Sequence, residues 1–305
     1  MLAVENLRKS FDSKIVLDGL NFTIEKGELY GLLGPNGAGK TTAINILCGL
    51  LKADEGMIRI AGKPPSELTK SLLGVVPQEI SVYKDLTCKE NLVFFSRIYG
   101  LSRYDGIAKA EELIDLFRLE EYANTEVHKL SGGWQRRVNI AVALVHSPTI
   151  LFLDEPTAGL DIEARFELWK LMDHLKSKEL AILLTTHILD EAQKLCSRIG
   201  IIQEGKIVAE GSLDELRKIV PAVQLAFVRT ENENLLRKKA TSFGWEIREY
   251  AGKLTLCLPE IYQLNEIVSK LADVPISAIS LHEVGLEQAY LEITKQNLPE
   301  NIKQG

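Results

Sequence analysis

The sequence predicts an α/β protein whose chain ends in a smaller α+β domain. Short apolar runs typical of buried strands alternate with amphipathic helices through residues 1–220. One of the strand-to-helix connections is rich in glycine, and residues 222–305 change to a different order of strands and helices. A composition of 46% hydrophobic and 26% charged residues fits such a globular protein.

The glycine-rich connection, residues 34–42, is the most informative stretch. It fits G-x-x-x-x-G-K-[ST], follows an apolar strand at 29–33 and precedes a helix-compatible run at 43–51, which is the setting of a phosphate-binding loop. Glycines let backbone amides turn inward, and the helix N-terminus adds partial positive charge. We predict that Lys40 reaches the β- and γ-phosphates of a nucleotide and that Thr41 binds Mg²⁺. The loop consists of Gly34, Pro35, Asn36, Gly37, Ala38, Gly39, Lys40, Thr41 and Thr42.

A second apolar strand, 149–153, ends in Asp154 and Glu155. Burying an unpaired carboxylate costs several kcal/mol, so two carboxylates at a strand end indicate a function for their charge. We expect Asp154 to share the Mg²⁺ of Thr41 and Glu155 to accept a proton from water. The alternative is a solvated acidic turn.

Three further features are weaker on their own. Phe11 lies at a turn between two predicted strands, where its ring either stacks on a purine or joins a small core. The Ser-Gly-Gly run at 131–133 opens a helix and predicts a second anion site, although such a run alone is more often a flexible turn. His187 follows a strand at 181–185, and we favour a phosphate contact over a core or surface position.

Residues of about 85–145 are expected to form a helical subdomain inserted between strand-rich stretches. Thr87 and Glu90 form a capping box that opens a helix, Gly100 ends it, and helical spacing returns at 105–119. The other elements expected in this first part are strands at 2–7, 21–24, 57–61, 73–76, 199–203 and 206–209 and helices at 162–176 and 212–220.

Pro221 marks the expected domain boundary. After it, the order βαββαβ plus a last helix suggests a ferredoxin-like sandwich at 222–296, followed by a polar tail at 297–305. This part carries no catalytic constellation. Its expected strands are 224–229, 246–250, 253–258 and 276–281, and its expected helices are 234–243, 261–271 and 286–294.

The bulk properties exclude several classes of protein. A net charge of −6 argues against a chain that coats nucleic acid. None of the four cysteines forms a C-x-x-C pair, which disfavours metal knuckles and redox motifs. No apolar run approaches the ~20 residues needed to span a bilayer, and the N-terminus lacks a signal peptide. We therefore expect a cytoplasmic protein that meets a membrane only through a partner.

Taken together, the motifs resemble those of the nucleotide-binding subunit of an ATP-binding cassette (ABC) transporter, across residues 1–220. This resemblance implies a P-loop NTPase fold, ATP and Mg²⁺ as cofactors, and two cassettes that close head to tail. The matching features in chain order are Phe11, the loop 34–42, Gln78, the signature 130–134, the strand 150–155, the loop 158–161 and His187.

The resemblance also implies residue roles. Phe11 would lie against adenine, Glu155 would activate water, and His187 would hold the γ-phosphate. Gln78 would link Mg²⁺ and water to the transport partner, and Asp161 would work across the dimer interface. The signature residues Ser131, Gly132 and Gly133 would bind the ATP of the other chain, with Ser131 and Gly133 at its γ-phosphate.

The sequence departs from the commonest family pattern at two positions. Trp134 stands in place of Gln, and Ile162 stands where Pro often follows the aspartate Asp161. The stretch 285–291 resembles the closing helix of drug- and polysaccharide-exporter ATPases, which favours export. The partners implied are a second nucleotide-binding subunit, in a homodimer or heterodimer, and a separate permease, with the chain peripheral on the cytoplasmic face of the membrane.

The alternative is a non-transport ABC ATPase that acts on ribosomes or DNA. The single cassette, the short stretch between Gln78 and Ser131 without sustained heptads, and the negative net charge count against it. We therefore expect no nucleic-acid partner.

Overall fold

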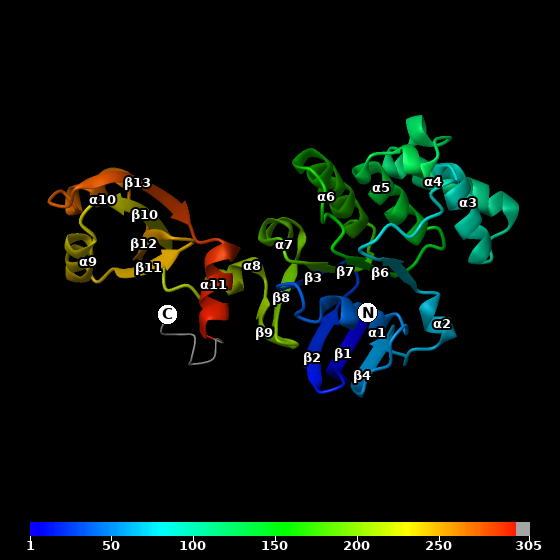
Figure 1. The fold of residues 1–305 in the computed structure, drawn as a ribbon, viewed down its shortest axis with the longest axis horizontal. Helices are drawn as coiled ribbons and strands as arrows, with labels where there is room; N and C mark the ends of the chain where they lie inside the picture. The colour runs from blue at the N-terminus through cyan, green and yellow to red at the C-terminus, as the bar shows by residue number, and fades with distance from the viewer. Residues whose placement is uncertain (297–305) are drawn as a thin grey trace. The chain divides into compact units, whose positions relative to one another are not determined.

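The structure, a computed structural model, describes residues 1–296 of the 305-residue chain. The chain divides into two compact units, residues 1–210 and 211–305 (Figure 1). Helix α8 (Leu213–Arg217) packs against α11 (Leu286–Gln296), so it belongs to the second unit. The boundary that the sequence suggested, Pro221, therefore lies inside the second unit, because a helix that follows the first unit in sequence packs with the end of the chain. The polar tail expected at 297–305 lies outside the described residues.

A six-stranded sheet in the order β5-β6-β7-β3-β8-β9 forms the centre of the first unit. The pairs β5–β6, β6–β7, β7–β3 and β3–β8 are parallel, which requires crossover connections and buries both faces of the sheet. The strands β3, β5, β6 and β7 are accordingly near-continuous apolar runs, as the sequence predicted, and the edge strand β9 is more polar and exposed. In chain order, the six strands of the sheet are β3 (Leu29–Leu33), β5 (Leu73–Val76), β6 (Ile150–Asp154), β7 (Ala181–Thr186), β8 (Arg198–Gln203) and β9 (Lys206–Gly211).

The two faces of this sheet carry separate hydrophobic cores because successive side chains of a strand point to opposite faces. Leu151 and Leu153 of β6 join one core, whereas Ile150 and Phe152 join the other. The second core also takes residues from α1 and from the three-stranded antiparallel sheet β2-β1-β4 (Figure 1). These elements are β1 (Leu2–Phe11), β2 (Lys14–Ile24), α1 (Lys40–Leu47) and β4 (Glu55–Ile60).

Helices α3, α4 and α5 pack against one another and contribute to the first core, as an inserted helical subdomain would. The capping box of Thr87 and Glu90 opens α3, as the sequence predicted. The helices of this region are α3 (Cys88–Ile98), α4 (Arg103–Phe117), η1 (Glu120–Tyr122), η2 (Val127–Lys129) and α5 (Gly132–Ala143). Helix α6 (Ile162–Lys176) follows β6.

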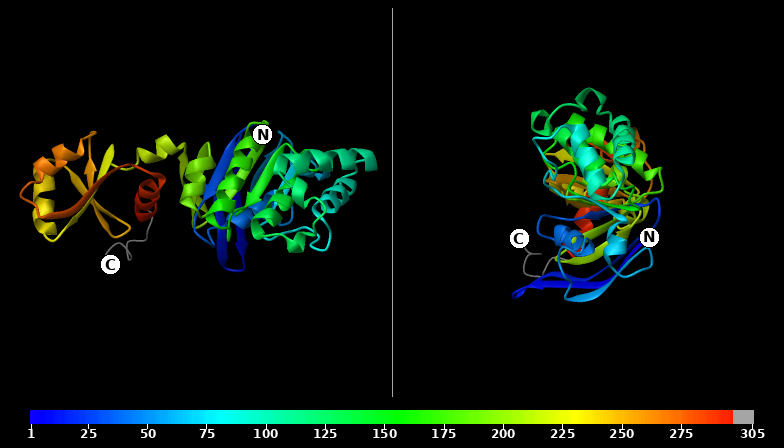
Figure 2. Two further views of the ribbon diagram at one scale, coloured as in Figure 1. Left: turned by 90° about the horizontal axis from the view of Figure 1, so that it is seen from above. Right: turned by 90° about the vertical axis from the view of Figure 1, so that its right-hand side faces the viewer.

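The second unit has a four-stranded antiparallel sheet in the order β11-β12-β10-β13, and α9 and α10 lie together on one side of it (Figure 2). The order βαββαβ expected from the sequence is observed, and the ferredoxin-like sandwich remains our interpretation of it. The elements are β10 (Gln224–Thr230), α9 (Glu233–Ser242), β11 (Glu246–Tyr250), β12 (Lys253–Leu258), α10 (Leu264–Lys270) and β13 (Ile276–Glu283).

The sequence analysis missed two short helices, α2 (Glu67–Lys70) and α7 (Leu189–Leu195), which are too short to show a clear period. It also placed Phe11 in a turn, whereas Phe11 is the last residue of β1 and pairs with Lys14 of β2. Among the described residues, no helix is both long enough and apolar enough to cross a membrane.

Candidate functional site

The carboxyl ends of β6, β7 and β3 meet at one edge of the parallel sheet, where ligands of open α/β folds bind. The strand register aligns Asp154 with Thr185 and Leu33 with Thr186. The amide of Gly34 then donates to the carbonyl oxygen of Thr186 at 3.1 Å. The glycine-rich loop and the acidic strand end are therefore brought to the same place, as the sequence predicted.

The glycine-rich loop has a backbone that other residues adopt rarely. Gly37 and Gly39 have φ angles of 82° and 104°, both in the left-handed region. A Cβ at Gly39 would also lie 2.7 Å from Leu17 Cδ2. Helix α1 begins at the next residue with no side-chain hydrogen bond at its N-cap. Its first amides therefore remain available to an anion, which fits the phosphates of a nucleotide.

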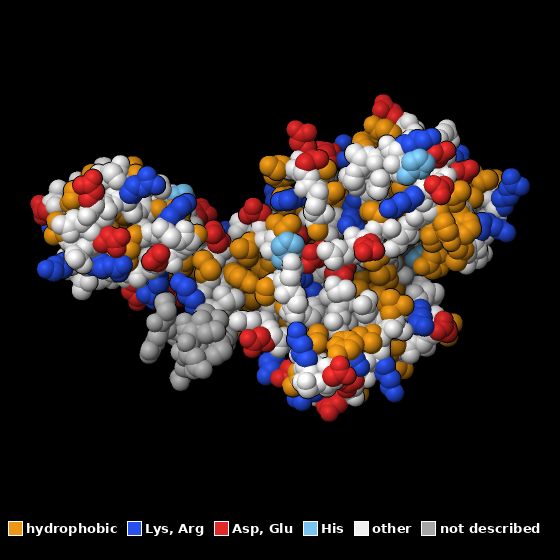
Figure 3. Space-filling model, viewed as in Figure 1, with side chains coloured by type: hydrophobic (Ala, Val, Ile, Leu, Met, Phe, Trp, Pro, Cys, Tyr) orange, Lys and Arg blue, Asp and Glu red, His pale blue; other side chains and the backbone are white. Residues whose placement is uncertain are grey.

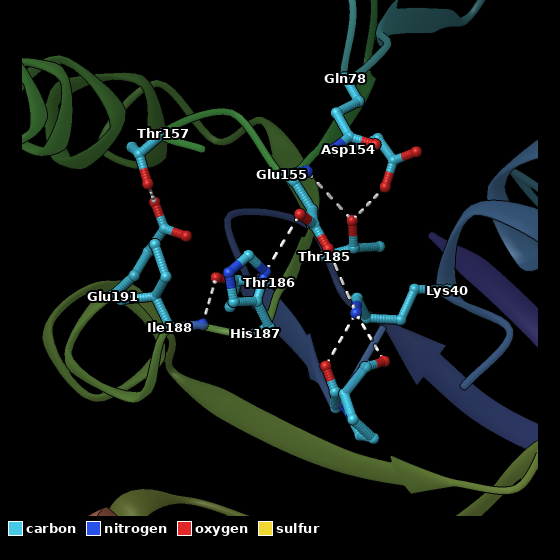
Figure 4. Close-up of polar contacts among 12 residues, drawn as sticks. Lys40, Gln78, Asp154, Glu155, Thr157, Thr185, Thr186, His187, Ile188 and Glu191 are labelled. Atoms are coloured by element: carbon cyan, nitrogen blue, oxygen red, sulfur yellow. Dashed lines mark hydrogen bonds and ion pairs between the residues drawn. The ribbon is translucent and has the colours of Figure 1, made fainter. Parts of the chain in front are cut away.

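Lys40 is 4% exposed, and its ammonium is surrounded by oxygen atoms (Figure 4). Nζ donates to the carbonyl oxygens of Gly34 at 2.8 Å and Pro35 at 3.0 Å, and lies 3.2 Å from Glu155 Oε1. Because a buried ammonium must be paired, these contacts hold the charge at the loop. Phosphate oxygens are acceptors of the same kind.

Glu155 is buried and has an unusual backbone for a non-glycine residue, with φ of 46°. Its amide donates to the carbonyl oxygen of Thr185 at 3.1 Å, and its Oε2 lies 3.1 Å from His187 Nδ1 (Figure 4). Strained backbones of this kind cluster at functional sites. The turn places the Glu155 carboxylate between the ammonium of Lys40 and the ring of His187.

The carboxylate of Asp154 is buried and accepts a hydrogen bond from the hydroxyl of Thr185, close to Gln78 (Figure 4). Carboxylate, hydroxyl and amide oxygens are the ligands that Mg²⁺ prefers, usually completed by water and substrate phosphates. Among the described residues, no group of three or more His, Cys, Asp or Glu forms a metal site. The side-chain oxygens of Asp154, Thr41 and Gln78 are donors of the kind that such an ion takes.

A cavity of about 420 Å³ opens at the glycine-rich loop. Its lining joins Gln78 and Glu155 to the loop but leaves out the predicted residues Phe11, Asp161 and His187 and the run 131–133. The sequence analysis missed Lys14 and Val16 at this cavity. The lining residues are Lys14, Val16, Asn36, Gly37, Gly39, Lys40, Thr41, Thr42, Gln78 and Glu155.

Ser131 is the N-cap of α5, but its side chain caps no amide of the helix. Ser131 and Gly132 are exposed, and Gly133 is half-buried. The ring of Trp134, which departs from the commonest pattern, lies 4.5 Å from the ring of Tyr122 and 4.3 Å from the guanidinium of Arg137. Trp134 thus packs within the helical subdomain and leaves the first residues of the helix accessible.

Two other predicted residues have contacts of their own. Phe11 is 46% exposed, with Lys9 Nζ 5.4 Å from the centre of its ring. Asp161 Oδ1 accepts from the amide of Ala164 at 2.8 Å and so caps α6. Neither contact tests the role that the family resemblance implies.

Arg136 of α5 was not singled out from the sequence. This buried side chain donates to the carbonyl oxygens of Pro77 at 2.8 Å and Gln78 at 2.6 Å. Burial lowers the pKa of the Arg136 guanidinium, and the charge of Asp154 opposes that shift. The helix that begins with the Ser-Gly-Gly run is therefore tied to the backbone of Gln78.

Glu191, a buried residue of α7, accepts hydrogen bonds from side chains of other elements. Its Oε1 accepts from Thr157 Oγ1 at 2.7 Å (Figure 4) and also from Trp169 Nε1 at 3.2 Å. Desolvation by burial raises the pKa of the Glu191 carboxyl, although hydrogen bonds from neighbouring side chains partly oppose the shift. Nothing in the local sequence distinguishes this glutamate from a surface residue.

A parallel sheet with a phosphate loop, an acidic strand end and an inserted helical subdomain defines the class of ATP-binding cassettes. Comparison with known sequences agrees, because the profile of the family described as "ABC transporter" matches residues 17–158. The chain is 32% identical to the linearmycin resistance ATP-binding protein LnrL of Bacillus subtilis (strain 168), over 98% of this chain and 99% of that protein. It is 40% identical to the Nod factor export ATP-binding protein I of Burkholderia thailandensis, over 83% of this chain and 84% of that protein.

Solved structures give the same result. The structure of cbiO1 from Clostridium perfringens, described as part of the ABC transporter complex cbiONQ, has a TM-score of 0.67 and 26% identity, covering 80% of this chain and 95% of that one. A dimeric ATP-binding cassette in a post-hydrolysis state, bound to ADP and Pi, has a TM-score of 0.63 and 27% identity, covering 70% and 98%. The chain belongs to the ATP-binding proteins of ABC transporters, and it is an ATPase.

Replacing Thr185 by Val should slow ATP hydrolysis without unfolding the chain. Thr185 Oγ1 donates to Asp154 and accepts from the Glu155 amide at 3.2 Å, so the variant loses both contacts while it keeps the side-chain shape. A net loss of ~1 kcal/mol for each of the two hydrogen bonds predicts that kcat falls by up to about 30-fold. Steady-state phosphate release measures it. Thr186→Val removes a contact to Ile188 instead, and an equal fall for both variants would contradict a specific role of Thr185.

Replacing Glu191 by Gln should change how stability depends on pH. A raised pKa means that the folded chain binds this proton more tightly than the unfolded chain. The contribution is full below the ordinary glutamate pKa of about 4.3 and is lost as pH rises through the folded value. The unfolding free energy of the wild type relative to Glu191→Gln should therefore fall as pH rises. Urea unfolding at a series of pH values measures it, and a difference that is constant or rises with pH would contradict the shift.

Proposed function

We propose that the chain hydrolyses ATP in a site completed by a second nucleotide-binding chain and thereby drives a separate permease. The observation that carries this proposal is the split of the predicted site. The groups around Lys40 and Glu155 share one cavity, whereas the run 131–133 lies outside that cavity with its helix N-terminus uncapped. The loop 34–42 of one chain and the run 131–133 of the other chain then bind the same ATP.

Within one chain, the loop 34–42 and the first turn of α1 bind the phosphates of ATP, with Lys40 at the β- and γ-phosphates. Thr41, Asp154 and Gln78 hold Mg²⁺, and the ion supplies neutralisation of phosphate charge when it is bound. Their oxygen donors and the burial of Asp154 support this assignment.

Glu155 acts as the general base. It takes a proton from water as the water oxygen bonds to the γ-phosphorus and the bond to the ADP oxygen breaks. Its contacts to Lys40 and His187 orient the carboxylate. We assign His187 to the γ-phosphate, where it stabilises developing charge.

Residues 131–133 and Asp161 act from the second chain. The second chain's Ser131, Gly132 and Gly133 bind the ATP held by the loop of the first chain, through their amides and the Ser131 hydroxyl. The exposed and uncapped N-terminus of α5 supports this assignment. Asp161 works across the interface, and Phe11 lies against the adenine ring.

Transport is proposed from the relatives and from one surface. The relatives are described by linearmycin resistance and Nod factor export, which favours an exporter. Hydrophobic side chains gather over α3 (Figure 3), and they include the exposed Tyr83, Phe94, Ile98 and Tyr99. We assign this surface to the permease, which holds the chain at the cytoplasmic face of the membrane.

A parallel capture experiment tests the partner. Tagged Glu155→Gln protein is incubated with ATP and Mg²⁺ in detergent-solubilised membranes and in the soluble fraction, and mass spectrometry identifies what binds. A polytopic membrane protein from the membrane fraction supports the transporter. Ribosomes or nucleic acid from the soluble fraction, without a membrane protein, would support the non-transport ATPase instead.

A further inference from the structure

One edge of the sheet in the second unit is long and unpaired. Strand β13 has eight residues and, among the described residues, pairs only with β10; it runs along the outer margin of its unit (Figure 1). Between Ile276 and Leu281 it contains no charged residue and no proline. An edge strand with these properties is a template for pairing with another strand, because its outward amides and carbonyls lack partners.

The opposite edge of the same sheet is protected. Strand β11 has five residues, and three of them, Glu246, Arg248 and Glu249, are charged. Arg248 is also bound to Glu292 of α11, with Nε 3.2 Å from Oε1. Charges and short length are the usual means by which proteins prevent edge pairing. The two edges of this sheet therefore differ: β13 carries no charge between Ile276 and Leu281, although Pro275 precedes it and its register against β10 shifts between Ile276 and Ala278.

Apolar side chains of β13 are left incompletely covered. Ile276, Ile279 and Leu281 pack against the core of the second unit but remain only partly buried. Their neighbours in the middle of the sheet, Ala226 and Leu256, are fully buried. The core thus stops at β13, where a further strand would cover its last row.

We propose that β13 pairs antiparallel with β13 of a second copy of this chain, joining the two sheets across a two-fold axis. The pleat restricts the register, because opposed residues must be separated by an even number for the core faces to continue. An axis at Ser280 places Ile279 opposite Leu281 and Ala278 opposite His282. This register brings apolar side chains together on the core face and sets no like charges against each other.

A second copy is the occupant that the strand itself favours, because a two-fold interface must be self-complementary. With the axis one residue earlier, at Ile279, Ser277 would lie opposite Leu281, and only one apolar pair, Ile279 with its own copy, would remain instead of two. The inference deepens the proposed function and rests on it for the presence of two copies. Two chains already joined at their ATP sites need little additional contact to pair a second time.

Cysteine cross-linking of the full chain tests this register. With the axis at Ser280, two copies of Ser280→Cys place their Cβ atoms about 5 Å apart, within reach of a disulfide. The matched control is Ser277→Cys on the same strand, whose two copies would lie ~20 Å apart. Both serines are exposed, and the hydroxyl of each makes a hydrogen bond, Ser280 with His282 and Ser277 with the carbonyl oxygen of Arg229. The wild type, with its four free cysteines, gives the background.

Oxidation is carried out at high protein concentration without nucleotide, and again on the Glu155→Gln background with ATP and Mg²⁺. We expect Ser280→Cys to form severalfold more disulfide-linked dimer than Ser277→Cys in at least one of these states. Cross-linking of Ser280→Cys no greater than the control in both states would overturn the inference, as would preferential cross-linking of Ser277→Cys. Light scattering on the same samples reports the ATP-driven dimer separately, so failure of the edge pairing and failure of the proposed function give different results.

Discussion

Replacement of Glu155 by Gln is expected to stop ATP turnover while the chain still binds nucleotide. The amide keeps the size of the side chain, and its one oxygen can still accept from Lys40, whose Nζ lies 3.2 Å from Oε1, while its NH2 group faces His187, whose Nδ1 lies 3.1 Å from Oε2. It cannot accept a proton from water. Loss of a general base costs ~10²–10⁴-fold in rate, so kcat should fall by that factor. Phosphate release and nucleotide titration measure the two quantities.

Glu163→Gln is the matched control, because Glu163 is an exposed glutamate in the first turn of α6 and should leave kcat unchanged. A Glu155→Gln chain that hydrolyses ATP near the wild-type rate would contradict the assignment of the base. Loss of nucleotide binding in step with turnover would assign Glu155 to binding instead.

Replacement of Lys40 by Ala is expected to act mainly on binding. The change removes an ammonium that has three oxygen contacts at 2.8 Å, 3.0 Å and 3.2 Å. In the complex with ATP, the ammonium would donate to a phosphate oxygen instead. One hydrogen bond of a charged group contributes ~1.5–3 kcal/mol, so the loss of that bond should lower ATP affinity by about 10- to 100-fold. Titration with a fluorescent nucleotide measures the change.

Removing Lys40 also leaves Glu155 buried without its ammonium partner, so the melting temperature is recorded with each titration. Lys52→Ala, at an exposed lysine, should bind ATP as the wild type does. Wild-type affinity in Lys40→Ala, together with lost turnover, would reverse the roles given to Lys40 and Glu155.

Much of the first unit could be predicted because its signals are local. Buried parallel strands are unbroken apolar runs, and the loop 34–42 carries its glycines, lysine and threonine in one stretch. The same holds for Asp154 and Glu155, since they directly follow an apolar strand. The structure brings these groups together because the strands that precede them, β3 and β6, both pair with β7 in the sheet.

The residues that were missed act over long sequence separations. The side chain of Arg136 reaches Gln78 across 58 positions, and Thr157 reaches Glu191 across 34. Thr185 looks like any strand residue until the register sets it beside Asp154. The compact units divide at 210/211, before the expected boundary Pro221, because α8 packs with a helix near the end of the chain. Pairings of this kind depend on the assembled fold and leave no local pattern.

The most direct test of the composite site is the mass of the Glu155→Gln chain in solution with ATP and Mg²⁺, compared with the same chain carrying Ser131→Arg. We expect the mass to double with ATP in the first chain and to stay that of a monomer in the second, while the second still binds ATP at its own loop. A Glu155→Gln chain that stays monomeric with ATP bound, or a Ser131→Arg chain that still dimerises, would contradict an ATP site shared between two chains.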